Sequence, residues 1–266
     1  MSVTNRNNHP AYFEPVLYGS AAHPWEANVS QLRKSHLTRR SVLGSAFVLT
    51  AALCMRCPCH AGEVRRYCLV RGAGSDEGQV VAASSYSSPE FIRLANLEHR
   101  LHSKFFKTRY ELGVDLNGTG AYYDVDTQKV VISDLLIRAI GNNDYGVIRL
   151  AAVLAHEVSH SFQVQHKIDN LLTEQSKSVK YLELHADYMA GYYIAWRGLI
   201  SQIDPVHIAA TFYQLGDIRL GDEDHHGTQT QRYLAFRQGY LDFGKYGGDG
   251  AKAGAGGLLF VRQLYQ

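Results

Sequence analysis

Cysteine is scarce in this sequence, and long apolar runs are absent. Three of the four cysteines lie between residues 54 and 59, ahead of the position where we expect the chain to be cleaved. Cys68 alone would then remain, so the mature chain would have no internal disulfide and its core would hold the fold unaided. No stretch stays apolar for the roughly 20 residues that a membrane-spanning helix needs. The formal net charge of +2 over 266 residues is too small to indicate a nucleic-acid partner.

The first 61 residues have the character of a leader. Residues 1–37 are polar and show neither helical nor strand periodicity, so we expect them to be disordered. Residues 38–61 resemble a twin-arginine export signal, because Arg39 and Arg40 precede an apolar run of 14 residues and cleavage is expected after Ala61. This signal would place the mature protein in the periplasm or outside the cell. Without cleavage, residues 42–55 would hold the chain at a membrane.

Residues 155–160, A-H-E-V-S-H, contain the motif H-E-x-x-H at the end of an apolar run. On a helix, residues four apart lie on one face, so His156 and His160 can direct ring nitrogens at one point, at about the 2.0–2.1 Å that zinc prefers. Glu157 lies roughly 100° further round the helix. Its carboxylate would therefore sit beside the metal and could take a proton from a water molecule. These residues predict a zinc site in which His156 and His160 are ligands and Glu157 is the catalytic base.

The third ligand is expected on a helix predicted from Val179 to Trp196. Glu183 and Asp187 are four residues apart and share a face, whereas His185 points away from both. Glu183 is the best third ligand, and Asp187, one turn on, can accept the free N–H of a ligand imidazole. Two alternatives stay open, namely Asp187 as the ligand with Glu183 behind it, and His185 as the ligand. A pair of carboxylates on a solvated face is disfavoured because the helix is largely apolar.

Two β-rich stretches precede the H-E-x-x-H motif. Residues 121–125 and 129–133 predict a hairpin around a turn at residues 126–128. An open edge of the second strand, at Val130, Val131 and Ile132, could bind an extended peptide substrate by strand addition. The residues support a purely structural hairpin equally well.

Capping residues and apolar spacing predict the other elements. Ser88 and Pro89 begin a helix that runs to about Arg109 and has an apolar face of Leu94, Leu97, Leu101 and Phe105. The H-E-x-x-H helix should be capped by Asn143 or Asp144, the next helix by Ser178, and a later one by Asp204 and Pro205. Thr228 should cap the last helix, with Tyr233, Leu234, Phe236 and Tyr240 inward.

The small residues 190 and 191 should let the two motif-bearing helices approach each other. Residues 64–81 and 167–177 are expected to be irregular, and residues 247–266 to be a Gly-rich mobile tail.

Three spaced motifs together resemble the bacterial neutral zinc metallopeptidase family, and more loosely the gluzincins. They are H-E-x-x-H at residues 156–160, E-L-x-A-D at residues 183–187, and H-G-T-x-x-Q-R at residues 226–232. The resemblance, over roughly residues 113–243, implies a zincin-like α+β fold, mostly helical, with a small hairpin or sheet beside the active-site helix, in a metallopeptidase domain that we expect over residues 62–246. It also implies His156, His160 and Glu183 as ligands of Zn²⁺. Ser159 and Tyr188 depart from the family pattern, but neither occupies a ligand position.

The last motif adds two candidate site residues. A loop histidine near the metal, His226, could hydrogen-bond the oxyanion that forms when water attacks a carbonyl, and we treat it as a candidate catalytic residue beside Glu157. Arg232 could brace His226 or pair with Asp187. The alternative for His226 is a plain surface position. We expect a zinc metalloendopeptidase acting on a peptide or protein substrate. The competing interpretation is a non-catalytic, zinc-stabilised module that binds a peptide or an envelope component.

Overall fold

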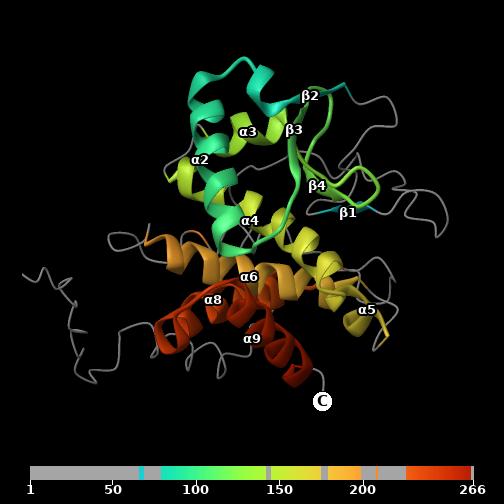
Figure 1. Cartoon of the computed structure of the whole chain (residues 1–266), viewed down its shortest axis with the longest axis vertical. Helices are drawn as coiled ribbons and strands as arrows, with labels where there is room; N and C mark the ends of the chain where they lie inside the picture. The colour runs from blue at the N-terminus through green and yellow to red at the C-terminus, as the bar shows by residue number, and fades with distance from the viewer. Residues whose placement is uncertain are drawn as a thin grey trace, which may run out of the picture. The chain divides into compact units, whose positions relative to one another are not determined.

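A computed structural model describes residues 66–68, 79–141, 145–174, 179–198, 208 and 226–264. In these ranges the chain is mostly helical with one small mixed sheet, so the expected α+β class is confirmed (Figure 1). The helices are α2 (Pro89–Phe105), α3 (Asp134–Gly141), α4 (Gly146–Gln165), α5 (Ile168–Thr173), α6 (Lys180–Arg197), α8 (Gln229–Tyr246) and α9 (Gly250–Gln263), with a 3-10 turn at Ala83–Ser85. The strands are β1 (Arg66–Cys68), β2 (Val80–Ala82), β3 (Glu111–Asp115), β4 (Ala121–Asp124) and β5 (Lys129–Ser133).

The sheet has the strand order β1-β4-β5-β3-β2. The predicted hairpin is present, since β4 and β5 pair antiparallel and the Asp124 carboxylate accepts hydrogen bonds from the backbone N–H groups of Asp126 and Thr127 in the turn. On its other side β5 pairs in parallel with β3. Because β5 is an interior strand, both of its edges are already hydrogen-bonded.

The predicted substrate-binding role of Val130, Val131 and Ile132 is therefore wrong. An incoming peptide could add only to a strand with a free edge, and the edges of this sheet are β1 and β2. All three side chains are buried. The sequence does not show this, because nothing in the hairpin itself indicates that β5 has a parallel partner, β3, on its other edge.

Helix α4 lies between the sheet and α6, and α8 and α9 cover the far side of α6 (Figure 1). Every residue of α4 from Leu150 to Gln163 is buried, and so is every residue of α6 from Leu182 to Ile194. A helix that is buried all round must find an internal partner for each polar side chain that it carries. The H-E-x-x-H and E-L-x-A-D motifs lie within these two buried spans.

Two helix caps predicted from the sequence are confirmed. The Ser88 side chain accepts a hydrogen bond from the Phe91 N–H at the start of α2. Thr228 and Gln231 form a capping box at the start of α8. Helix α4 begins after Tyr145, at Gly146, and the predicted caps Asn143 and Asp144 lie outside the described residues. The same holds for Ser178, for the helix predicted from Asp204 apart from Ile208, and for the leader and export signal at residues 1–61.

The apolar faces predicted for two helices are partly wrong. Leu97 on α2 is 38% exposed, and Leu234 on α8 is 41% exposed. On α2 the buried face carries Glu98 and His102 instead. The spacing of apolar residues cannot predict the burial of Glu98 and His102. A charged or polar residue is buried only when residues distant in the sequence supply its partners.

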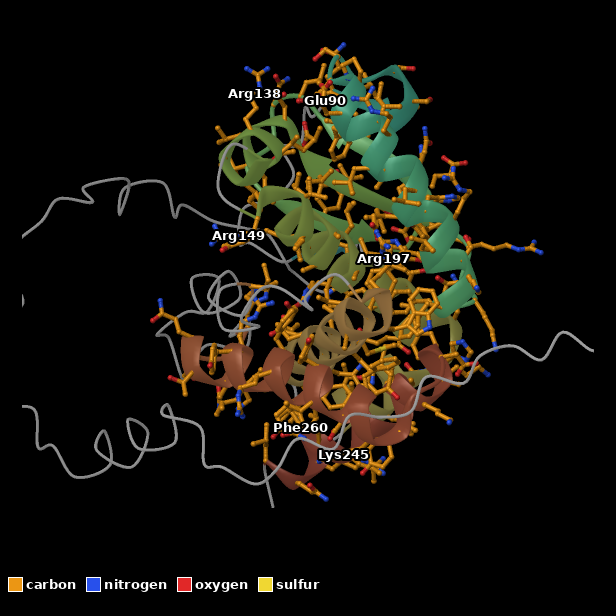
Figure 2. All side chains as sticks on the ribbon, turned by 90° about the vertical axis from the view of Figure 1, so that its left-hand side faces the viewer. Glu90, Arg138, Arg149, Arg197, Lys245 and Phe260 are labelled. Atoms are coloured by element: carbon orange, nitrogen blue, oxygen red, sulfur yellow. The ribbon has the colours of Figure 1, made fainter. Side chains whose placement is uncertain are left out.

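Those partners form a network between α2 and α6. Arg197 donates to Glu98 over 2.8 Å, and Tyr193 also donates to this carboxylate. The His102 Nδ1 lies 2.8 Å from the Tyr110 hydroxyl, and its Nε2 lies 3.8 Å from Glu98 Oε2. Figure 2 shows Arg197 where α6 passes α2. Burial and the positive charges of His99 and Arg197 lower the pKa of His102 to about 3.

The described part of the predicted mobile tail at residues 247–266 is ordered, since Gly250–Gln263 form α9. The Asp249 side chain caps this helix by accepting from the Ala251 N–H. Glycine permits close packing here: a Cβ at Gly254 would come within 2.7 Å of Phe162, and one at Gly250 within 2.6 Å of the Phe105 carbonyl oxygen. The expectation of irregular structure is also wrong for β1, β2 and α5, which are short elements with weak periodicity.

The tightest contact between helices joins α6 and α8. A Cβ at Gly191 would lie 1.9 Å from the Phe236 carbonyl oxygen, and a Cβ at Gly239 would lie 1.8 Å from the Tyr188 carbonyl oxygen. Gly191 thus lets α6 approach α8, and not α4 as the sequence suggested. No helix in the described ranges combines the length and apolar character needed to cross a membrane.

Replacing either of these glycines by alanine should separate α6 from α8. Because the obstructing atoms are backbone oxygens, which cannot rotate away, we expect Gly191→Ala and Gly239→Ala to lower the free energy of unfolding by about 3 kcal/mol or more. Gly244→Ala is the matched control on α8, since a Cβ there meets nothing within 4 Å. Helix propensity should make that variant neutral or more stable by up to about 1 kcal/mol. Urea unfolding measures all three, and equal stabilities would contradict the close contact.

Acid should destabilise the fold through His102. In the unfolded chain this side chain has a pKa of about 6.5, whereas in the fold the pKa is about 3. As pH falls from about 6.5 to about 3, the unfolded chain binds a proton that the folded chain does not. The free energy of unfolding should therefore fall by up to about 1.4 kcal/mol per pH unit from this residue. Urea unfolding of the parent and His102→Gln should give a shallower pH dependence for the variant, and identical slopes would refute the assignment.

Candidate metal centre

Three side chains from two helices meet in the interior. His156 and His160 lie one turn apart on α4, and their Nε2 atoms are 3.2 Å from each other. Glu183 on α6 places Oε2 at 3.3 Å from the Nε2 of His156 and Oε1 at 3.5 Å from the Nε2 of His160. All three are at most 1% exposed, and together they form a group that could hold a metal ion. The expectation that Glu183 would join the two histidines is met.

The spacing of the donor atoms suits a small divalent cation. Four ligands arranged tetrahedrally at about 2.0–2.1 Å from an ion, as around zinc, are separated from one another by about 3.3–3.4 Å. The two histidine nitrogens are 3.2 Å apart, which is close to that value, and each of them lies 3.3 or 3.5 Å from a different oxygen of Glu183. Two imidazoles and a carboxylate are also a common donor set for such ions. The residues present therefore fit a metal ion in their chemistry and in their proximity.

Asp187 orients the ring of His156. Its Oδ1 lies 2.9 Å from the Nδ1 of His156, on the side of the ring that faces away from Glu183. This contact of Nδ1 with the carboxylate leaves Nε2 directed at the other two donors. This is the contact that the sequence predicted for Asp187. It excludes the alternative in which Asp187 joins the donor group and Glu183 lies behind it.

Arg232 reaches the site from α8. Its Nε donates to Asp187 Oδ2 and its Nη2 donates to Asp187 Oδ1, each over 2.8 Å. Nη2 also lies 3.5 Å from Glu183 Oε2, and the side chain is fully buried. Of the two partners considered for Arg232, the structure thus has Asp187. A two-pronged pair of this kind holds a carboxylate in one orientation, so Arg232 fixes the residue that in turn orients His156.

Charged side chains of opposite sign lie together in this cluster. Burial lowers the pKa of His156, but its hydrogen bonds to Asp187 and Glu183 outweigh burial and raise it to about 9. Burial raises the pKa of Glu183, yet the nearby His160 and His226 bring it well below its usual range. Burial lowers the pKa of His160 to about 4, so this ring is neutral. The imidazole of His156 and the guanidinium of Arg232 thus lie among the carboxyl groups of Glu183, Asp187 and Glu157, and these opposite charges reduce the cost of burying the cluster.

Glu157 and His226 flank the group of donors. Glu157 follows His156 on α4, is fully buried, and lies close enough to Arg232 to raise the pKa of that guanidinium. The Nδ1 of His226 is 3.6 Å from Glu183 Oε1, and its side chain is 12% exposed. His226 is thus not a plain surface residue. The capping box at Thr228 holds the start of α8, and His226 is two residues before it.

Sequence reasoning missed Gln163. Its Oε1 lies 2.9 Å from the Nδ1 of His160. Gln163 thus contacts the Nδ1 of His160 in the same way that Asp187 contacts the Nδ1 of His156. The available signal was its position three residues after His160, on the same face of an otherwise apolar helix. His185 points away from the donors, as expected, and contacts Gln163. The alternative of His185 as a ligand is therefore excluded.

Comparisons with known proteins found no relative of this chain. No protein-family model matches the chain, and neither a search of curated proteins nor one of solved structures found a match. The resemblance to neutral zinc metallopeptidases therefore depends on the three sequence motifs.

Proposed function

We propose that this chain is a zinc-dependent metallopeptidase. The observation that carries the proposal is the position of Glu183, which comes from a separate helix and meets the two histidines of H-E-x-x-H in a buried cluster. A bare H-E-x-x-H motif arises by chance in a histidine-rich chain. A buried carboxylate at ligand distance, with a charged residue behind one of the imidazoles, is much less expected by chance.

Zinc is the ion that we assign to this site. His156, His160 and Glu183 supply two nitrogens and one oxygen, which is a donor set found in catalytic zinc sites. Structural zinc sites usually have four protein ligands and are rich in cysteine. The described residues bring three candidate ligands together, and none of them is a cysteine. A fourth position would then be left for water or substrate.

The chemistry divides between the ion and the side chains. A bound zinc ion would polarise the substrate carbonyl and lower the pKa of water toward 7. Glu157 would take a proton from the attacking water and pass it to the nitrogen of the leaving amine. His226, on the more exposed side of Glu183, would donate a hydrogen bond to the oxygen that becomes negative as the carbonyl is attacked. Asp187 and Arg232 would keep the ring of His156 in place.

The proposed substrate is a peptide or protein. Since β5 is an interior strand, we leave peptide binding to other surfaces: Val130 and Ile132 pack in the core that contains α4, and Val131 packs against Tyr122. We also propose that the protein acts in the periplasm or outside the cell, on the strength of the export signal at residues 38–61.

Zinc content tests the ligand set. We expect about one zinc per chain in the parent protein and little in Glu183→Ala, because two imidazoles alone bind the ion weakly. Glu174→Ala is the matched control, since this glutamate is exposed at the end of α5 and should leave the zinc content unchanged. Elemental analysis after removal of loosely held metal gives the result. Equal zinc in the parent and Glu183→Ala would show that the ligand lies elsewhere.

Glu157→Gln tests the catalytic step. The amide has nearly the shape of the carboxylate but cannot accept a proton, so we expect zinc to stay bound and peptide cleavage to fall at least about 100-fold. Cleavage of a mixed peptide library, followed by mass spectrometry, measures the rate. Cleavage by the variant at the parent rate would refute the mechanism. A parent that holds zinc and cuts nothing, but retains peptides, would instead support the non-catalytic binding module.

A further inference from the structure

A chain of hydrogen bonds leads from His160 to the C-terminal helix. The Nδ1 of His160 lies 2.9 Å from Gln163 Oε1. The Gln163 Nε2 donates to the Leu182 carbonyl oxygen over 2.8 Å and lies 3.0 Å from the Nδ1 of His185. The Nε2 of His185 lies 3.1 Å from the Gly254 carbonyl oxygen. Helices α4, α6 and α9 are thus connected through the polar side chains of Gln163 and His185, both fully buried.

The two carbonyl groups determine every donor and acceptor along this chain. A carbonyl oxygen can only accept, so Gly254 requires a proton on the Nε2 of His185, which leaves Nδ1 of that ring as an acceptor. Leu182 likewise requires the amide nitrogen of Gln163 on its side. The two N–H groups of Gln163 then point at Leu182 and His185, and Oε1 is left to accept from His160.

It follows that His160 carries its proton on Nδ1. Its Nε2 then presents a lone pair, and this is the nitrogen that lies 3.2 Å from His156 Nε2 and 3.5 Å from Glu183 Oε1. In both candidate ligand imidazoles, Nε2 faces the cluster and Nδ1 contacts a supporting side chain on the other side of the ring. The two rings differ in the group that they face: His156 faces the carboxyl group of Asp187, and His160 faces the side-chain amide of Gln163.

We propose that Gln163 and His185 are positioning residues that fix the tautomer and orientation of His160, and that α9 is part of the support of the metal centre. The packing of α9 agrees with this role. A Cβ at Gly257 would lie 3.0 Å from the His185 ring, and a Cβ at Gly254 would lie 2.7 Å from Phe162 on α4. Glycine at both positions lets the α9 backbone come close enough for the Gly254 carbonyl to reach His185.

This inference rests on the proposed metal site for its consequence, but the hydrogen-bond chain can be tested without metal. In the metal-free full-length protein at neutral pH, long-range ¹H–¹⁵N correlations identify which ring nitrogen of each histidine is protonated. We expect a proton on Nδ1 of His160 and on Nε2 of His185. A proton on Nε2 of His160 would overturn the proposal, whether or not the protein binds zinc.

The second measurement is the affinity for Zn²⁺ alone, by competition with a chelator. Loss of a residue that orients a metal-binding imidazole typically weakens binding by about 10–100-fold, and we expect this of Gln163→Met. His185→Leu should also weaken binding, whereas His185→Asn should restore much of it, because its side-chain oxygen can replace the Nδ1 acceptor. His102→Leu is the matched control, since it also removes a fully buried histidine but belongs to the network of α2.

The outcomes separate the two proposals. Affinities of Gln163→Met and His185→Leu equal to that of the parent would overturn the positioning role. An equal loss in His102→Leu would also overturn it, because the effect would then reflect general destabilisation. A parent with the expected tautomers that binds no zinc would refute the proposed function and leave the role of Gln163 and His185 in fixing His160 supported.

Discussion

The structure depends on partners for the ionisable side chains of α6. This helix has no exposed face along its middle, so each of these side chains needs a buried group to pair with it. Glu183, His185 and Asp187 alternate along this buried stretch and point into three different neighbours. Glu183 meets the histidines of α4, His185 meets Gln163 and the α9 backbone, and Asp187 meets Arg232 of α8. Burying an uncompensated ion costs several kcal/mol. Each of the three neighbouring helices must therefore supply its partner, which constrains where α4, α8 and α9 can lie.

The contact between α6 and α8 shows how packing serves this requirement. Gly191 and Gly239 let the two backbones touch, and this sets how far the α8 side chains must reach. Arg232, two turns before Gly239 on the same helix, then spans the gap to Asp187 with two hydrogen bonds. The position of His156 thus depends on two glycines that do not themselves contact the candidate metal ligands. The position of His160 likewise depends on Gly254 and Gly257 on α9.

Local patterns predicted the parts of the molecule that local rules determine. The H-E-x-x-H helix, the hairpin of β4 and β5 and the Ser88 and Thr228 caps follow from spacing within a few residues. Glu183 was found differently, because it shares a face of a largely apolar helix with Asp187 and so needs buried partners. Long-range pairing could not be predicted in this way. The parallel partner of β5, the burial of Glu98 and His102, and the contact of α9 with His185 each depend on residues distant in sequence. Glycines in α9 suggested flexibility because nothing in the sequence showed what would pack against them.

The residues of the site are spread along the chain, and their order determines when the site can assemble during synthesis. His156, His160, Glu183 and Asp187 are synthesised before Arg232, which comes from the next helix described after α6, and Gly254 follows later still. A nascent chain that ends at α6 has the carboxyl groups of Glu157, Glu183 and Asp187 for the interior but lacks the Arg232 guanidinium that pairs with Asp187, so we expect the packed cluster to be unstable at that stage. The centre becomes stable only after α8 has been synthesised. This order delays assembly of the centre and keeps partly made chains without a finished site.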